Sequence, residues 1–131
     1  MSEENVRVVQ AGIAAYNRGD WTAVLSFMTP DVEVDFSRAE GPLHGVFRRD
    51  ELRGMLDELA DVWEWIRLEA DEIIEVGESV IVPVTMHVRG RHGIEVTSRP
   101  THVYTIRGGA ISRLTMYQER EDALEALKIR E

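Results

Sequence analysis

Apolar residues recur at helical spacing in the first part of the chain. Val6, Val9, Ile13 and Tyr16 fall on one stripe, and an apolar side chain every three or four residues is the pattern of an amphipathic helix. Asp20 then offers a carboxylate that can cap the free amides of a second, shorter helix. These positions predict two consecutive helices, each of which buries one face.

Two further helices are expected from the same periodicity. The strongest pattern starts near Arg48, where apolar residues from Leu52 to Trp63 share one face and acidic residues occupy the other. The stretch from Asp122 to Arg130 predicts a brief closing helix. The chain therefore has three helices in its N-terminal half and one at its C-terminal end.

Strand periodicity accounts for most of the remaining chain. Residues 32–36 alternate apolar and acidic side chains, which predicts a half-buried strand after a turn at residues 29–31. Residues 37–45 (SRAEGPLHG) lack periodicity, so we expect a loop that lies over the mouth of a site. Residues 65–118 read as four strands separated by glycine-containing turns. Pro83 lies inside one of these strands and indicates an irregular ladder or a sheet edge.

Helices followed by an antiparallel meander define an α+β fold in which the helices cover one face of the sheet. We expect a single domain over residues 1–131. Its curved, mainly antiparallel sheet wraps around the three N-terminal-half helices, and a short helix closes the chain. A cone that side chains do not fill to its end is a concave, apolar site of the kind that binds small molecules.

Charge and cysteine content narrow the function classes. The chain has 24 Asp and Glu against 15 Lys and Arg, a formal charge of -9, which disfavours nucleic acid as a partner. No apolar run approaches the roughly 20 residues of a membrane span, and the N-terminal segment is acidic where a secretion signal is basic. The absence of cysteine excludes disulfides and cysteine-based zinc sites. We expect a cytoplasmic protein without metal or cofactor, whose partner is a small apolar molecule.

Four segments of the sequence carry a family likeness. They are AYNRGDWTAVLSFMTPDVEVDF, LHG ahead of a helix, VYTIRGGAISRLTMYQER and the closing DALEAL. In this order they resemble the SnoaL-like branch of the NTF2-like superfamily over nearly the whole chain. The resemblance implies a cone-shaped α+β barrel that forms a homodimer through its sheet. It does not imply one reaction, because the superfamily includes isomerases, cyclases, hydrolases, dehydratases and non-catalytic binding domains.

Catalytic positions carried over by this resemblance are mostly apolar here. The base, the oxyanion-binding tyrosine and the protonated aspartate of ketosteroid isomerases fall on Phe36, Gly12 and Thr101. The Asp-Arg-Asp set of limonene-epoxide-hydrolase-like members falls on Val84, Met86 and Met116. Neither set can transfer protons as in those enzymes, so both mechanisms are rejected. SnoaL-type polyketide cyclases have an acid near the end of the final strand, where Glu119 is the nearest acid here.

Three polar residues are candidates for contacts inside the cone. Tyr16 ends the first helical stripe, so its hydroxyl should orient a ligand or donate a proton there; the alternative is a core tyrosine bonded to a carbonyl. The resemblance gives Thr101 and Gln118 the same inward parity as Leu114 and Met116. These polar residues would supply hydrogen bonds in an otherwise apolar lining.

Four histidines raise the question of metal or acid-base chemistry. His44 is on the loop, and a glycine turn separates His87 from His92, so no pair has the spacing of a metal site. His102 has the opposite parity to the binding candidate on its strand and should face a dimer interface. The alternative is an irregularity after Pro100, because a bulge would rotate His102 inward.

Two further groups of residues have more than one interpretation. An aromatic wall for a planar ligand, or ordinary core packing, accounts for Trp21, Phe27, Phe36, Trp63 and Trp65. Steering of an anionic ligand, or pairing with acids on an exposed face, accounts for Arg38, Arg48, Arg49 and Arg53.

The sequence thus predicts a SnoaL-like domain that binds small, largely apolar organic molecules, cyclic ones included. The expected pocket residues are Tyr16, Phe36, Trp63, Val84, Met86, Thr101, Leu114, Met116 and Gln118. An isomerase, cyclase or hydrolase would use Tyr16, His102 or Glu119 as its acid-base group. A non-catalytic ligand-binding or dimerisation domain is the alternative, because so many recognised catalytic positions are apolar.

Overall fold

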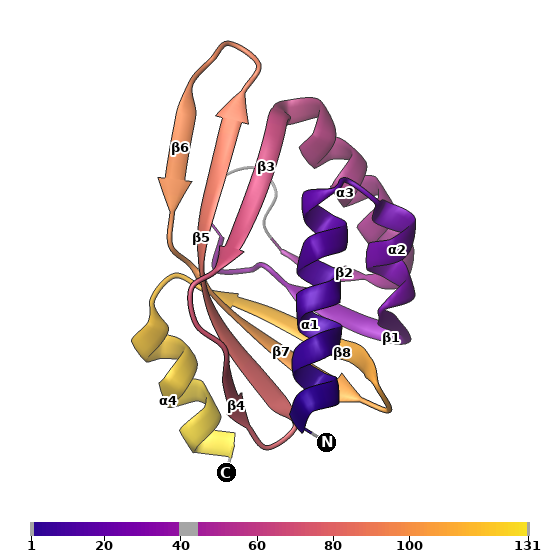
Figure 1. Cartoon of the computed structure of the whole chain (residues 1–131), viewed down its shortest axis with the longest axis vertical. Helices are drawn as coiled ribbons and strands as arrows, with labels where there is room; N and C mark the ends of the chain where they lie inside the picture. The colour runs from indigo at the N-terminus through magenta and orange to yellow at the C-terminus, as the bar shows by residue number, and fades with distance from the viewer. Residues whose placement is uncertain (1, 40–44, 131) are drawn as a thin grey trace.

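The computed structural model describes residues 2–39 and 45–130, and it confirms the α+β class (Figure 1). Three helices lie on one side of a curved sheet and the fourth lies on the other. The helices are α1 (Ser2–Asn17), α2 (Trp21–Ser26), α3 (Arg49–Val62) and α4 (Arg120–Arg130). The strands are β1 (Met28–Asp35), β2 (Val46–Arg48), β3 (Trp63–Ala70), β4 (Ile74–Val76), β5 (Ser79–Gly90), β6 (Glu95–Ser98), β7 (Thr101–Arg107) and β8 (Ala110–Tyr117). No helix in these described ranges is long and apolar enough to cross a membrane.

Local signals set the boundaries between the first helices. Asp20 caps α2 as predicted, because its carboxylate accepts a hydrogen bond from the Ala23 amide at 3.1 Å. Gly19, with φ of +70°, supplies the left-handed turn between α1 and α2. At the start of α3, the Arg48 amide donates to the Glu51 carboxylate at 2.9 Å, which satisfies a backbone donor ahead of the helix.

Asn17 ties the end of α1 to the neighbouring strand β3. Its side-chain amide donates to the Leu68 carbonyl at 2.9 Å and accepts from the Leu68 amide at 2.8 Å. Both backbone groups of Leu68 are therefore paired by one side chain, as a further strand would pair them. This contact fixes the helix against the sheet at the level of the site described below.

The two halves of the sheet share β5. The strand order is β2-β1-β8-β7-β5-β3, with β4 and β6 also paired to β5. The β1–β8 pair is parallel and the other pairs of described strands are antiparallel. At Pro83 the partners of β5 change, and nearby bonds run outside the ladder: the Asp71 amide donates to the Pro83 carbonyl at 2.9 Å and the Val84 amide to the Pro100 carbonyl at 3.0 Å. The irregular ladder inferred from Pro83 is therefore confirmed.

The strand count and one turn differ from the sequence-based expectation. The four strands expected after residue 65 are six, because short breaks at residues 71–73 and 99–100 divide two of them. The turn expected at residues 29–31 lies within β1, where the register with β8 shifts between Met28 and Glu33. Such a bulge keeps turn-forming residues inside a strand. The three-residue strand β2 is too short to produce a periodic signal.

Both faces of the central sheet are buried. Val80 and Val82 of β5 are fully buried in the main core, which includes side chains of the N-terminal helices. On the opposite face Ile81 packs with Val103 and with Ala123 of α4. A strand buried on both sides reads as a continuous apolar run, which explains why residues 80–82 are all aliphatic.

Candidate functional site

A cavity of about 340 Å³ lies on the concave side of the sheet. Its walls come from α1, α2 and α3 and from strands β1, β3 and β5–β8. Most of the lining side chains are aliphatic, aromatic or thioether groups. The volume falls within the range of roughly 300–1,000 Å³ that small-molecule sites occupy.

Most of the expected pocket residues line this cavity. Those that do are Tyr16, Phe36, Trp63, Met86, Leu114 and Met116. Val84, Thr101 and Gln118 do not. Val84 is packed into the core at 1% exposure, and Gln118 is exposed because β8 ends at Tyr117. Strand parity therefore no longer applies at position 118.

Two of the five aromatic residues that were expected to form a wall line the cavity. Phe36 and Trp63 contribute to the lining, whereas Trp21, Phe27 and Trp65 are not among the lining residues. The Trp21 ring instead packs beside the Tyr16 ring, with centroids 5.7 Å apart. Trp21 therefore has the core-packing role, which was one of the two interpretations of the aromatic residues.

Thr101 and His102 face the sides opposite to those expected. His102 lines the cavity and pairs with Met116 across β7 and β8. In a hairpin with unbroken register Met116 would pair with Thr101 instead, because partners would be equidistant from the turn. A register shift next to Thr105 inserts Ser112 into β8 and moves each later partner by one residue. The inward histidine therefore results from a bulge in the hairpin rather than from an irregularity after Pro100.

His102, Tyr104 and Tyr16 form a polar cluster in the apolar wall. His102 Nδ1 lies 3.4 Å from Tyr104 Oη, and both side chains are buried. The Phe36 ring stacks near the imidazole, with centroids 6.3 Å apart. Tyr104 was not singled out from the sequence, although its position two residues after His102 on the same strand face is the signal that identifies it.

All three polar groups are uncharged at neutral pH, and burial moves each pKa further from ionisation. It lowers the pKa of His102 from 6.5 to about 4 and raises the pKa of Tyr16 to about 12. Burial also raises the pKa of Tyr104, and the nearby Tyr16 raises it further. The common cause is the cost of placing charge in an apolar cavity, since no Asp, Glu, Lys or Arg is among the described lining residues.

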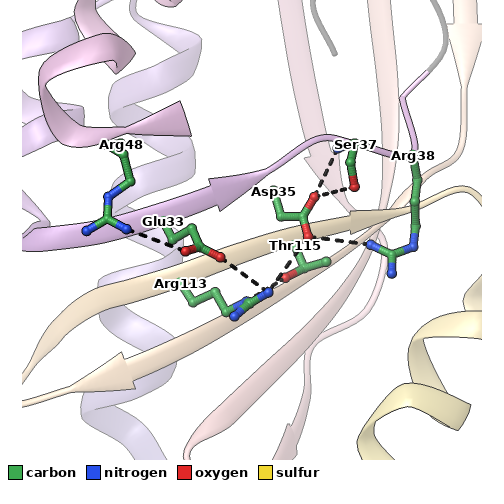
Figure 2. Close-up of polar contacts among 7 residues, drawn as sticks. All are labelled: Glu33, Asp35, Ser37, Arg38, Arg48, Arg113 and Thr115. Atoms are coloured by element: carbon green, nitrogen blue, oxygen red, sulfur yellow. Dashed lines mark hydrogen bonds and ion pairs between the residues drawn. The ribbon is translucent and has the colours of Figure 1, made fainter. Parts of the chain in front are cut away.

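Charged residues instead form a ladder on the opposite face of β1 and β8 (Figure 2). Glu33 lies 3.6 Å from Arg48 and 3.4 Å from Arg113. Asp35 lies 3.7 Å from both Arg113 and Arg38. Val34, between the two acids, lines the cavity, so alternation along β1 places Glu33 and Asp35 on the far side. The ladder therefore neutralises charge outside the cavity.

The segment after β1 is held from this outer face. Asp35 accepts hydrogen bonds from the Ser37 amide at 3.0 Å and the Ser37 hydroxyl at 2.6 Å. Burial raises the pKa of Asp35, but the Ser37 bonds and the charges of Arg38 and Arg113 outweigh it and hold the pKa below its ordinary value. The Gln118 side chain donates to the Arg38 carbonyl at 2.7 Å. These contacts fix the chain on both sides of Phe36.

Three of the four basic residues near the loop pair with acids, as the second of their two interpretations has it, and Arg49 bonds to backbone carbonyls instead. Arg38 and Arg48 belong to the ladder, and Arg53 lies 3.7 Å from Asp57 on α3. Arg49 donates to the Met28 carbonyl at 3.0 Å. Arg53 also donates to the Thr22 hydroxyl at 3.4 Å, and none of the four lines the cavity.

The remaining candidates lie away from the cavity or outside the description. Glu119 and His92 are exposed, and His44 lies outside the described residues. His87 Nε2 is 3.0 Å from Glu69 Oε1, a pair that linear spacing did not reveal because it forms between β3 and β5. Within residues 2–39 and 45–130, no group of three or more His, Cys, Asp or Glu could hold a metal ion.

Comparison with solved structures extends over nearly the whole chain. TerC, crystallised with polyporic acid, is 26% identical, with a TM-score of 0.79 and coverage of 95% of this chain and 98% of TerC. An NTF2-like protein from Burkholderia pseudomallei K96243 is 25% identical, with a TM-score of 0.78 and coverage of 93% and 95%. A candidate polyketide cyclase from Xanthomonas campestris is 22% identical, with a TM-score of 0.67 and coverage of 94% and 96%, and shows the fold alone.

Comparison with sequences gives the family. No curated protein matches significantly. The model of the SnoaL-like domain matches residues 9–114, a span that includes the polar cluster and most of the cavity wall. Both the fold and this match agree with the resemblance found in the sequence, and the chain belongs to the SnoaL-like domain family of NTF2-like proteins.

Proposed function

We propose that this SnoaL-like domain binds a small, largely apolar, ring-containing organic molecule in its cavity. The observation that carries the proposal is the composition of the cavity lining. The cavity of about 340 Å³ is lined mostly by apolar side chains, and the polar residues His102, Tyr104 and Tyr16 lie among them. Burial of an apolar ring contributes roughly 25 cal/mol per Å² of surface removed from water. The cluster then orients the ring through hydrogen bonds.

The likeness to TerC supports an organic ligand of this kind. TerC has been crystallised with polyporic acid, and its fold matches that of this chain over 95% of the chain's length. Polyporic acid is therefore the first probe for the cavity. A simpler fused-ring hydrocarbon, tetralin, measures the apolar contribution by itself.

Binding without catalysis is the form of this function that we favour. Proton abstraction needs a base within hydrogen-bond reach of the ligand. No carboxylate is among the described lining residues, and burial makes His102 a weak base by lowering its pKa to about 4. Glu119, the acid implied by likeness to polyketide cyclases, is exposed outside the cavity. The cluster is better suited to holding a ligand oxygen than to moving a proton from carbon.

Calorimetry and thermal unfolding with polyporic acid and tetralin test the proposal. A ligand present at 100 times its Kd stabilises the folded state by about 2.7 kcal/mol. Met86→Trp adds a large ring to the cavity wall and should abolish binding. Val46→Trp adds the same ring at an exposed position of β2 and should leave binding intact. The proposal fails if neither ligand binds, or if Met86→Trp binds both as the wild type does.

We also propose that two copies pair through the sheet, as the family resemblance implies. Trp65, on the outer face of β3, is 38% exposed and would be covered by such a contact. Light scattering on the purified chain, whose mass is 14.9 kDa, measures the assembly. A monomer at micromolar concentration would contradict pairing, and the cavity proposal would be unaffected.

A further inference from the structure

His102 and Tyr104 act as a unit because of their places on β7. They are two residues apart and therefore point to the same face of the strand. On β8 their partners are Met116 and Leu114, which also line the cavity. The two rings meet edge to face, with centroids 6.1 Å apart and planes at 70°. This geometry brings His102 Nδ1 within 3.4 Å of Tyr104 Oη.

The strength of the bond between His102 and Tyr104 distinguishes the two neutral tautomers of His102. Either Nδ1–H donates to the Tyr104 oxygen or the Tyr104 hydroxyl donates to Nδ1, and each arrangement leaves one donor and one acceptor of the pair without a partner. A phenol hydroxyl is a stronger hydrogen-bond donor than a neutral imidazole N–H, and an imidazole nitrogen is a stronger acceptor than a phenol oxygen. The arrangement in which Tyr104 donates is therefore favoured, and it leaves an N–H donor on Nε2 of His102.

The surroundings of His102 keep the imidazole neutral, so that it carries one proton. The titratable group beside it on its own strand is Tyr104, and Tyr16 of α1 in turn acts on Tyr104. From β1 the uncharged Phe36 stacks on the ring, while Asp35 lies on the other face of that strand. No charged side chain is among the described residues that line the cavity. The imidazole of His102 is therefore not protonated a second time at neutral pH.

We infer that Tyr104 fixes His102 in the Nε2–H tautomer, and that His102 donates this hydrogen to a carbonyl oxygen on the ring of the bound ligand. Tyr16, whose hydroxyl has no hydrogen-bond partner among residues 2–39 and 45–130, supplies a second donor from α1. A carbonyl oxygen accepts two such bonds, whereas a hydrocarbon ring accepts none. The inference rests on the proposed function for the ligand, but the tautomer depends on the protein alone.

Nuclear magnetic resonance tests the tautomer without a ligand. Long-range ¹H–¹⁵N correlation spectra of the imidazole distinguish a protonated from an unprotonated nitrogen. At about pH 7 we expect His102 to show Nε2–H with an unprotonated Nδ1, and Tyr104→Phe to convert this to a mixture of both forms. Nδ1–H in the wild-type protein would overturn the inference, as would an unchanged Nε2–H signal in Tyr104→Phe.

A pair of matched ligands tests the carbonyl contact. The hydrogen bond should make 1-tetralone bind about tenfold more tightly than tetralin, since 1.4 kcal/mol corresponds to tenfold. The ratio should fall to about one in His102→Phe and to an intermediate value in Tyr104→Phe. Thr101→Val, a matched control one residue away on the other face of β7, should keep the wild-type ratio.

The outcomes separate this inference from the proposed function. If tetralin binds but the ratio is near one in the wild type, the cavity binds rings and the carbonyl contact is overturned. A wild-type ratio that persists in His102→Phe also overturns it. If neither ring binds, the proposed function fails and the ligand part of the inference fails with it, while the spectra still decide the tautomer.

Discussion

Acid should weaken the fold in a pH window that is set by His102. Burial lowers the pKa of His102 from 6.5 to about 4, so the unfolded chain takes up a proton that the folded protein refuses. The free energy of unfolding must therefore fall as the pH drops from about 6.5 to about 4, and this loss levels off below about pH 4. The difference between the two pKa values corresponds to about 3 kcal/mol, of which about 2 kcal/mol is lost by about pH 5.

Urea denaturation at a series of pH values measures this effect. The wild-type free energy of unfolding should decline through the window, whereas His102→Gln, which cannot titrate there, should give a flatter profile whatever its absolute stability. His92→Gln removes an exposed imidazole and serves as the matched control that keeps the wild-type slope. The comparison depends on slopes, so a general loss of stability in a variant does not disturb it.

The Asp35 carboxylate of the outer ladder acts in a lower pH range. The pKa of Asp35 is held below 3.8, so its contribution to stability is present above that pH and is lost only as the pH falls further. Its loss begins only at the lower end of the His102 window, so the two effects are separate above about pH 5. A flat wild-type profile between about pH 6.5 and about pH 4, or a wild-type slope in His102→Gln, would refute the reasoning.

Three substitutions elsewhere have definite expected outcomes. In Gly12→Ala the new Cβ would lie 3.7 Å from Ile111 Cδ1, an ordinary contact, so the helix should gain about 1 kcal/mol while calorimetry shows weaker tetralin binding in a smaller cavity. Asp35→Ala removes the acceptor of two hydrogen bonds and should cost about 1–3 kcal/mol in urea denaturation; a loss below about 0.5 kcal/mol would contradict a role in holding the segment. Asn17→Ala should cost a similar amount and speed amide exchange at Leu68, and unchanged exchange would argue against the bridge.

Helices and the class of fold were predictable because their signals lie within a few residues of one another. The stripe from Val6 to Tyr16 and the cap at Asp20 needed only local spacing. The mainly antiparallel meander followed from alternation and glycine turns. The family resemblance then supplied the cone, which neither signal specifies by itself.

The chemistry of the cavity was not predictable to the same degree. Whether Thr101 or His102 faces inward depends on Ser112, which bulges from the partner strand and leaves no mark in the alternation of β7. Tyr104 becomes a partner of His102 only once that face is known. Such properties depend on register between strands, which a single sequence does not encode locally.

The change of partners at Pro83 separates two tasks within one strand. The first half of β5 pairs with β4 and β7, and the second half pairs with β3 and forms a hairpin with β6. Because the hydrogen-bond ladder is interrupted between them, insertions or deletions at the hairpin tip need not propagate into the first half. Related sequences could therefore change the half of β5 that pairs with β3 and β6, and with it the shape of the cavity wall, while the half that pairs with β4 and β7 stays the same.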